Sequence, residues 1–198
     1  GSNDSVEGGG SLSFGTEFYN TDFSDREVLS FKVANVFKLE EDKNLPTNST
    51  LGNKTSDIFG ELNYNPNDFF KVNYEFSQDQ NLKDTNYQIL KNEFTINNFV
   101  TTFEYLNENN GLDKDSYLSN KTSYNLKETN SLIFETRKNK KTNATEFYNL
   151  IYQYRNDCLI AAIQYNKDYY TDRDLKADES IYLNLTIIPF GQTKSPNL

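Results

Sequence analysis

The sequence contains no histidine, no methionine and one cysteine, and it has no long apolar run. Without histidine, the chain cannot form a His-based catalytic triad, an imidazole metal site or a histidine general base. The lack of any run of about 18 apolar residues excludes a transmembrane helix but not transmembrane strands, which are short and expose only every second residue to lipid. Cys158 cannot close an internal disulfide, so it is either a buried thiol, which composition favours, or half of a bridge to a cysteine outside this chain.

Two further absences concern the ends and the charge. No methionine and no basic, apolar leader occur, which indicates either a mature product or an internal piece of a longer chain. The net charge of −9 argues against a nucleic-acid partner, because the phosphate backbone is bound by clustered Lys and Arg.

The aromatic content indicates that this polar chain is folded rather than disordered. Only 35% of the 198 residues are hydrophobic and the mean hydropathy is −0.79, values typical of a soluble protein. However, 14 Tyr and 15 Phe are too many for a disordered acidic segment, and both residue types favour strands. The composition therefore predicts an all-β protein.

Period-two alternation predicts the strands. In residues 70–76, aromatic and apolar side chains alternate with polar ones, and weaker alternation runs over residues 87–94. The apolar positions of the other segments are Leu12, Phe14, Thr16, Phe18; Leu29, Phe31, Val33, Phe37; Ile58, Gly60, Leu62, Tyr64; Phe99, Thr101, Phe103, Tyr105; Leu118, Thr122, Tyr124, Leu126; Leu132, Phe134, Thr136; Tyr148, Leu150, Tyr152, Tyr154; Leu159, Ala161, Ile163, Tyr165; and Ile181, Leu183, Leu185, Ile187. Segments of about ten residues suit tilted strands that cross a bilayer. We predict an antiparallel up-and-down meander of about 10–12 strands, most simply eleven, in a single domain spanning residues 1–198.

The connections between these strands alternate in length. Short turns are expected at residues 20–25, 65–67, 97–98, 127–130 and 156–157, and longer polar loops at residues 40–53, 78–83, 107–115, 139–143 and 171–178. Outer-membrane barrels show this sorting, with the short turns on the periplasmic side. If the last strand descends to the periplasm, an odd strand number predicts a chain cut within an extracellular loop of a larger barrel. Such a piece should show exposed edges or a non-native closure.

The alternate positions of the strands are polar and mixed in charge, as a hydrated or protein-plugged lumen requires. These inward positions include Lys71, Asn73, Glu75, Glu135, Arg137, Asn149, Gln153 and Arg155. Acidic clusters at residues 113–115 and 172–174 fall in predicted loops and match no EF-hand spacing. We therefore predict no catalytic residue, no cofactor site and no metal site.

Three stretches near the C-terminus resemble one family. They are residues 148–159 (YNLIYQYRNDCL), 169–174 (YYTDRD) and 187–191 (IIPFG). This pattern resembles the end of the LPS-assembly outer-membrane protein family LptD (OstA, organic solvent tolerance protein), in the versions found in alphaproteobacteria. Residues 5–9 (SVEGG) and the following strand are similar to a glycine-rich strand start in the middle of the same barrel. Residues 20–140 agree in pattern alone.

The resemblance implies a fold, a function and a location. In that family, a barrel in the cell outer membrane follows a periplasmic jellyroll domain, and the lipoprotein LptE plugs its lumen. Lipopolysaccharide (LPS) arrives along a periplasmic bridge and leaves through a lateral gate where the first and last strands meet. The chain would then be the C-terminal part of a non-enzymatic LPS translocon that contacts LPS, the lipoprotein plug, the bridge and outer-membrane lipid.

The resemblance also assigns roles to particular residues. Cys158 matches the family's barrel cysteine at a periplasmic turn, which bridges to a cysteine in the N-terminal domain, and so the resemblance favours the disulfide over the buried thiol. The last strand would be the C-terminal wall of the gate, formed by Ile181, Leu183, Leu185, Ile187, Pro189 and Phe190. Pro189 fits either a weakly paired edge or a simple strand terminator. Two rival functions are a passive porin-like barrel and a soluble β-barrel or sandwich that binds an apolar ligand.

Overall fold

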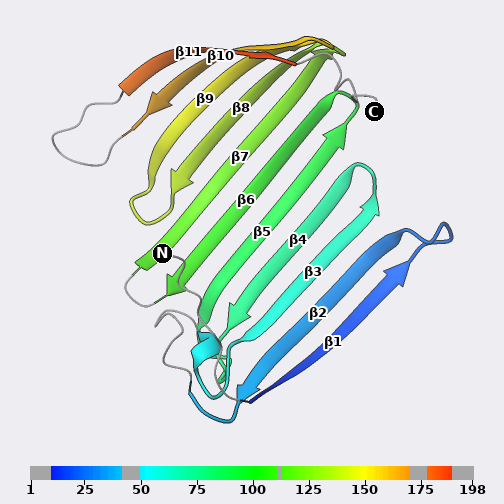
Figure 1. Cartoon of the computed structure of the whole chain (residues 1–198), viewed down its shortest axis with the longest axis vertical. Coiled ribbons are helices and arrows are strands. Elements are labelled where there is room, and N and C mark those ends of the chain that lie inside the picture. The colour runs from blue at the N-terminus through cyan, green and yellow to red at the C-terminus, as the bar shows by residue number, and fades with distance from the viewer. Residues whose placement is uncertain (1–9, 42–49, 111–112, 170–177, 189–198) are drawn as a thin grey trace, which may run out of the picture. The chain divides into compact units, whose positions relative to one another are not determined.

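The described residues form a meander of eleven strands. The computed structural model describes residues 10–41, 50–110, 113–169 and 178–188. The strands are β1 (Ser11–Thr21), β2 (Glu27–Lys38), β3 (Ile58–Asn67), β4 (Phe70–Gln78), β5 (Thr85–Ile96), β6 (Phe99–Asn110), β7 (Asp113–Lys127), β8 (Asn130–Asn139), β9 (Ala144–Arg155), β10 (Leu159–Asp168) and β11 (Asp178–Ile187), with one 3-10 turn, η1 (Thr50–Gly52). They follow one another in sequence order in a single sheet (Figure 1). The predicted all-β antiparallel meander is confirmed.

Strand lengths agree with the alternation in the sequence. The strands run from nine residues in β4 to fifteen in β7, which reaches or exceeds the length of about 9–11 residues that crosses a bilayer. The segment with weak alternation, residues 87–94, lies within the complete strand β5.

Two predicted connections are wrong. The turn placed at residues 65–67 lies at Asp68 and Phe69, because β3 continues to Asn67 and a register shift between Tyr64 and Asn67 accommodates Pro66, which has no N–H to donate. The long loop placed at residues 107–115 is mostly strand, since β6 reaches Asn110 and β7 begins at Asp113. Polar residues at strand ends resemble loops in sequence, but here they prolong the ladder.

By contact density, the chain divides into two compact units. One contains the strands up to Phe94 together with Phe103–Leu118, and the other contains Thr95–Thr102 and the strands from Ser119 onward. The first unit holds the β1–β2–β3–β4–β5 ladder, and the second holds the β8–β9–β10–β11 ladder.

The described part of the chain has no buried hydrophobic side chain. Its buried side chains are polar: Ser30, Ser56, Asp57, Ser77, Thr101 and Ser116. A water-soluble domain of this size is held together by buried Val, Leu, Ile and Phe. In this chain, backbone ladders and the medium around the strands must supply that cohesion.

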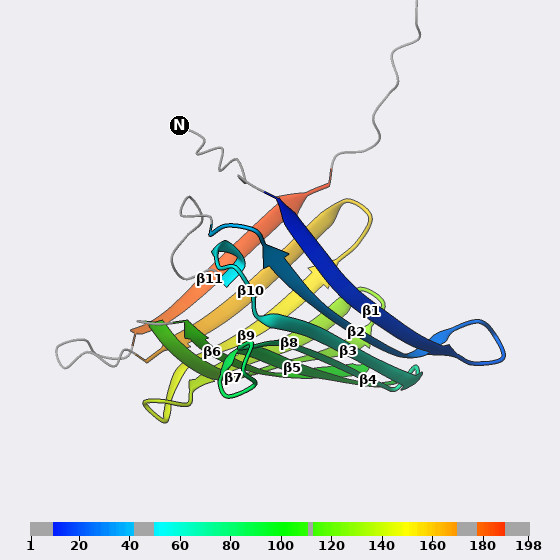
Figure 2. The same ribbon diagram turned by 90° about the horizontal axis from the view of Figure 1, so that it is seen from below.

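In the first unit, the β1–β2 and β3–β4 turns lie together at the right of Figure 2, and η1 lies at the opposite end of the strands. Arg26 joins the two turns. Its Nε donates to Asp22 Oδ2 at 3.0 Å, Nη1 donates to Asp68 Oδ1 at 3.1 Å, and Nη2 donates to the Pro66 carbonyl at 3.2 Å. One guanidinium therefore fixes the spacing of neighbouring hairpins at this end.

Candidate functional site

The first unit carries an apolar face formed by the predicted alternate positions. The β1–β2 register places Leu12 opposite Phe37 and Phe18 opposite Phe31. Phe14 packs edge-on against Phe37, with 5.7 Å between ring centroids. Phe14 and Phe18 nevertheless each expose 56% of their surface. Neighbouring aromatic rings cover one another only in part, and no other described layer covers this face.

The second unit repeats this arrangement. Phe134 and Tyr148 stack across β8 and β9, with 6.1 Å between centroids, and Leu150 lies opposite Phe134 in the register. On β10, Ile163 lies opposite Tyr152 and has 53% of its surface exposed. Exposed apolar patches of this extent would drive association in water, so this face requires an apolar environment.

Polar side chains on the apolar face bond to one another. In the second unit, the Thr101 and Thr122 hydroxyls are 2.7 Å apart, Asn120 Nδ2 donates to Thr101 Oγ1 at 3.0 Å, and Thr122 Oγ1 donates to Asn120 Oδ1 at 3.1 Å. In the first unit, the Tyr74 hydroxyl donates to Gln88 Oε1 at 3.2 Å. Internal pairing of this kind is what a hydrocarbon environment demands, because lipid offers no partner.

The opposite face is polar and is crossed by ion pairs. In the first unit, Lys71 Nζ lies 3.0 Å from Glu93 Oε1, and Asn73 donates to Asn63 Oδ1 at 2.9 Å. In the second unit, Lys121 Nζ lies 2.7 Å from Glu135 Oε1. The register places all the predicted inward positions on this face. Such a surface suits a water-filled or protein-filled lumen.

The predicted gate strand is β11. Its ten residues pair with β10, and its apolar side chains are more exposed than those of β9: Ile181 exposes 74% of its surface and Ile187 78%, compared with 42% for Leu150. The difference arises because β11 has one partner among the described strands and β9 has two. Pro189 and Phe190 lie outside the described residues.

Cys158 lies in the β9–β10 turn. Asn156 Oδ1 accepts hydrogen bonds from the backbone N–H of Cys158 at 3.0 Å and of Leu159 at 2.8 Å, which closes the turn. The thiol is partly exposed and unpaired within the described chain. In a meander this turn lies at the same end as the other odd-to-even turns, such as β7–β8, which is the predicted periplasmic end.

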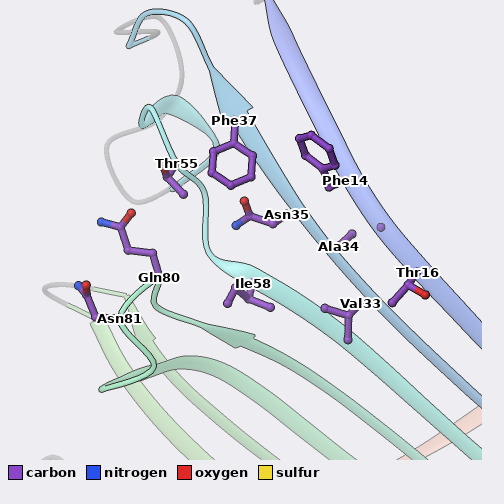
Figure 3. Close-up of a pocket in the computed structure, with 11 residues that line it drawn as sticks. Phe14, Thr16, Val33, Ala34, Asn35, Phe37, Thr55, Ile58, Gln80 and Asn81 are labelled. Atoms are coloured by element: carbon purple, nitrogen blue, oxygen red, sulfur yellow. The ribbon is translucent and has the colours of Figure 1, made fainter.

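A hollow of about 610 Å³ opens on the apolar face of the first unit. Figure 3 shows Phe14, Val33 and Ile58 on its strand side, and Thr55, Gln80 and Asn81 on the side of the connecting loops.

The hollow lies where the β2–β3 ladder stops, because β3 pairs only with Leu29–Ala34 of β2. Beyond Ala34, β2 bonds the chain before β3: Ser56 N donates to the Val36 carbonyl at 2.9 Å. At the point where β2 changes its partner from β3 to the chain before β3, the Asn35 amide donates to the carbonyls of Ser56 at 2.8 Å and Asp57 at 3.0 Å.

Asp79 shapes the loop that borders this hollow. Its Oδ1 accepts from the backbone N–H of Lys83 at 2.6 Å and of Asp84 at 3.1 Å. The Asp84 N–H is the main cause that lowers the pKa of Asp79. The ionised carboxylate therefore holds the β4–β5 loop closed and fixes the positions of Gln80 and Asn81.

Two findings concern sites of other kinds. No helix within the described ranges is long and apolar enough to cross a membrane. The same residues bring together no group of three or more acidic or cysteine side chains that could hold a metal ion.

The sequence patterns do not predict several polar contacts around the site. Asn35 and Asn120 sit at apolar-face positions, where the alternation predicts no polar residue. Arg26 contacts Asp68, which is 42 residues away in the chain, and no local pattern indicates such a contact. An isolated Asn at an otherwise apolar position is the one local feature that could have drawn attention to the first two.

Comparison with known protein families identifies a relationship. The family model LptD, described as LPS transport system D, matches residues 1–138. No curated protein matches the chain. The matched range contains residues 5–9 and the segment that agrees in pattern alone, and it ends before residues 148–191, which carry the most specific part of the resemblance. Because the match spans more than half of the chain, the chain belongs to the LptD family of LPS transport proteins.

Proposed function

We propose that residues 1–198 form the C-terminal wall of an outer-membrane β-barrel that inserts LPS into the outer leaflet. The supporting observation is the uncovered apolar face opposite a polar, ion-paired face, in a chain of an LPS transport family. The apolar face would contact lipid and the polar face would line the lumen. The resemblance to the alphaproteobacterial versions of the family remains a prediction from the sequence.

The partners follow from this arrangement. LPS is the substrate, and the polar face would contact a lipoprotein plug of the LptE type, because rows of amides and mixed charges can bond a protein surface as readily as water. An N-terminal periplasmic domain outside this sequence would receive LPS from the periplasmic bridge.

Depletion of the full-length protein in its host tests this function. LPS should accumulate in the inner membrane, as measured by density-gradient separation of the membranes, while outer-membrane phospholipid reaches its normal place. A porin-like protein would instead change only the uptake of small solutes. A soluble protein that binds an apolar ligand would fractionate away from membranes. The proposal would be contradicted if LPS still reached the outer membrane and the protein behaved in either of these two ways.

We further propose β11 as the C-terminal wall of the lateral gate, with Ile181, Leu183, Leu185 and Ile187 toward lipid and Pro189 and Phe190 following. Its exposed side chains and single described partner strand support this role.

Two disulfide locks in the full-length barrel test the gate. Cysteines at position 181 of β11 and on the first barrel strand should block LPS export until a reductant is added. The matched control joins β10 to β11 through Ala162→Cys and Asn184→Cys, which lie opposite each other in the register, and should leave export intact. Normal export with the first lock closed would contradict the gate.

We also propose that Cys158 forms a disulfide with a cysteine of the N-terminal domain. The turn leaves the thiol partly exposed at the predicted periplasmic end, in an oxidising compartment. Non-reducing electrophoresis of the full-length protein should show a mobility change on Cys158→Ser, which vanishes when both samples are reduced. Equal mobility of the wild type and Cys158→Ser under both conditions would indicate that Cys158 is a free thiol.

A further inference from the structure

The hollow between β1, β2 and the chain before β3 is amphipathic. Its strand side is mainly hydrocarbon from Phe14, Phe37, Val33 and Ile58, with Thr16 and Asn35 as polar exceptions. Its loop side carries the hydroxyl of Thr55 and the amides of Gln80 and Asn81. Among the described residues, no Lys, Arg, Asp or Glu lines it. A ligand that fits is a hydrocarbon chain with uncharged hydrogen-bonding groups at one end, and a bare phosphate does not fit.

The hollow is a built feature of the fold. Asn35 anchors the chain before β3 through two hydrogen bonds, and Asp57 extends that anchor, because its Oδ2 accepts from Ser77 Oγ at 2.6 Å and Asn86 Nδ2 at 2.8 Å. Asp57 is only 5% exposed. These bonds fix the chain before β3 against β2, and the hollow of about 610 Å³ lies beside them, within the range of about 300–1,000 Å³ typical of small-molecule sites.

We propose that this hollow holds one acyl chain of an LPS molecule in the outer leaflet, with the amide-linked, hydroxylated end of that chain against Gln80 and Asn81. The inference rests on the proposed function, which places the long-loop end of the strands in the outer leaflet, where LPS is the lipid. Hydroxyl and N–H donors of an N-linked hydroxyacyl chain match the amide oxygens on the loop side. The bound chain would lie over the strands at the point where β2 changes its partner from β3 to the chain before β3.

Filling the hollow tests the proposal. Val33→Trp places an indole in it, and Val72→Trp places the same group at another half-buried valine of the apolar face, outside the hollow. The full-length protein with its lipoprotein is extracted in mild detergent, and LPS and phospholipid bound per complex are quantified by mass spectrometry. LPS retained by Val33→Trp should fall at least about tenfold, and retention by Val72→Trp should stay at the wild-type level.

A photocrosslinking amino acid provides a second measurement that needs no filling of the hollow. Placed at Phe37, which lines the hollow, it should crosslink LPS in growing cells; at Phe31, on the same strand and face but outside the hollow, it should crosslink LPS much less. Three outcomes would overturn the proposal. They are equal crosslinking at both positions, equal loss of LPS in both tryptophan variants, and crosslinking of phospholipid instead of LPS at Phe37. LPS export measured in the same cells reports on the proposed function separately, because neither variant alters the gate strand.

Discussion

The two faces of the strands differ in which side chains are exposed and which are buried or paired. On the apolar face, many large side chains are exposed, such as Phe14 at 56% and Ile187 at 78%. On the polar face, small residues such as Ser30 and Ser77 are buried and charged residues pair across strands. Water-soluble sheets bury the large apolar residues and expose the charged ones. This difference is what the proposed contact of the apolar face with lipid requires.

The largest effect should come from placing a charge on the apolar face. Leu150→Arg should destabilise the full-length barrel in lipid vesicles by about 2–4 kcal/mol, because an Arg at the midplane must be desolvated. The adjacent Asn149 points to the polar face, and Asn149→Arg should change stability little. Urea unfolding in vesicles measures both. Equal effects at the two positions would abolish the distinction between the faces.

Breaking the polar cluster on the apolar face should have the next largest effect. Thr101→Val leaves Asn120 without one of its partners. If this face meets lipid as proposed, water cannot replace that partner, and the loss should cost about 1–3 kcal/mol. Thr16→Val is the control, since Thr16 lies on the same kind of face in β1 and no described side chain bonds its hydroxyl. A cost no larger than that of the control, in the same unfolding measurement, would show that water reaches Thr101.

An ion pair on the polar face should contribute less. The Lys71 and Glu93 side chains are 54% and 30% exposed, so water screens their attraction. A double-mutant cycle with Lys71→Ala and Glu93→Ala should give a coupling of about 0–1 kcal/mol that declines with added salt. A larger, salt-independent coupling would mean that this face is dry.

The smallest effect concerns pH at the β1–β2 turn. The backbone N–H groups of Ser24 and Arg26 lower the pKa of Asp22 below its usual value of 3.8. Its contribution to stability is therefore present above about pH 4 and is lost as pH falls through the lowered pKa. The unfolding midpoint of the wild type should drop more steeply below pH 4 than that of Asp22→Asn, while Asp25→Asn should behave as wild type. Parallel pH profiles for all three would contradict this assignment.

Much of the fold follows from local sequence, because a strand that separates two media must alternate. Residues 70–76 predicted β4 and its faces correctly for this reason. The ladder break at Ala34, the Arg26 contact with Asp68 and the hydrogen bonds of Asn120 depend on which strands meet, and sequence periodicity carries no such information. Strand ends such as Asn110 were misplaced because polar residues extend a ladder into water as readily as they form a loop.

Nitroxide labels at six consecutive positions of β9, residues 148–153, give the most direct test of the claim that one face meets lipid. The full-length protein is placed in lipid vesicles, and each label's accessibility to oxygen and to a water-soluble nickel complex is measured by electron paramagnetic resonance. The account predicts strict alternation, with oxygen dominant at Tyr148, Leu150 and Tyr152 and the nickel complex dominant at Asn149, Ile151 and Gln153. Labels at the first three positions that neither reagent reaches would indicate a packed protein core and would contradict the account.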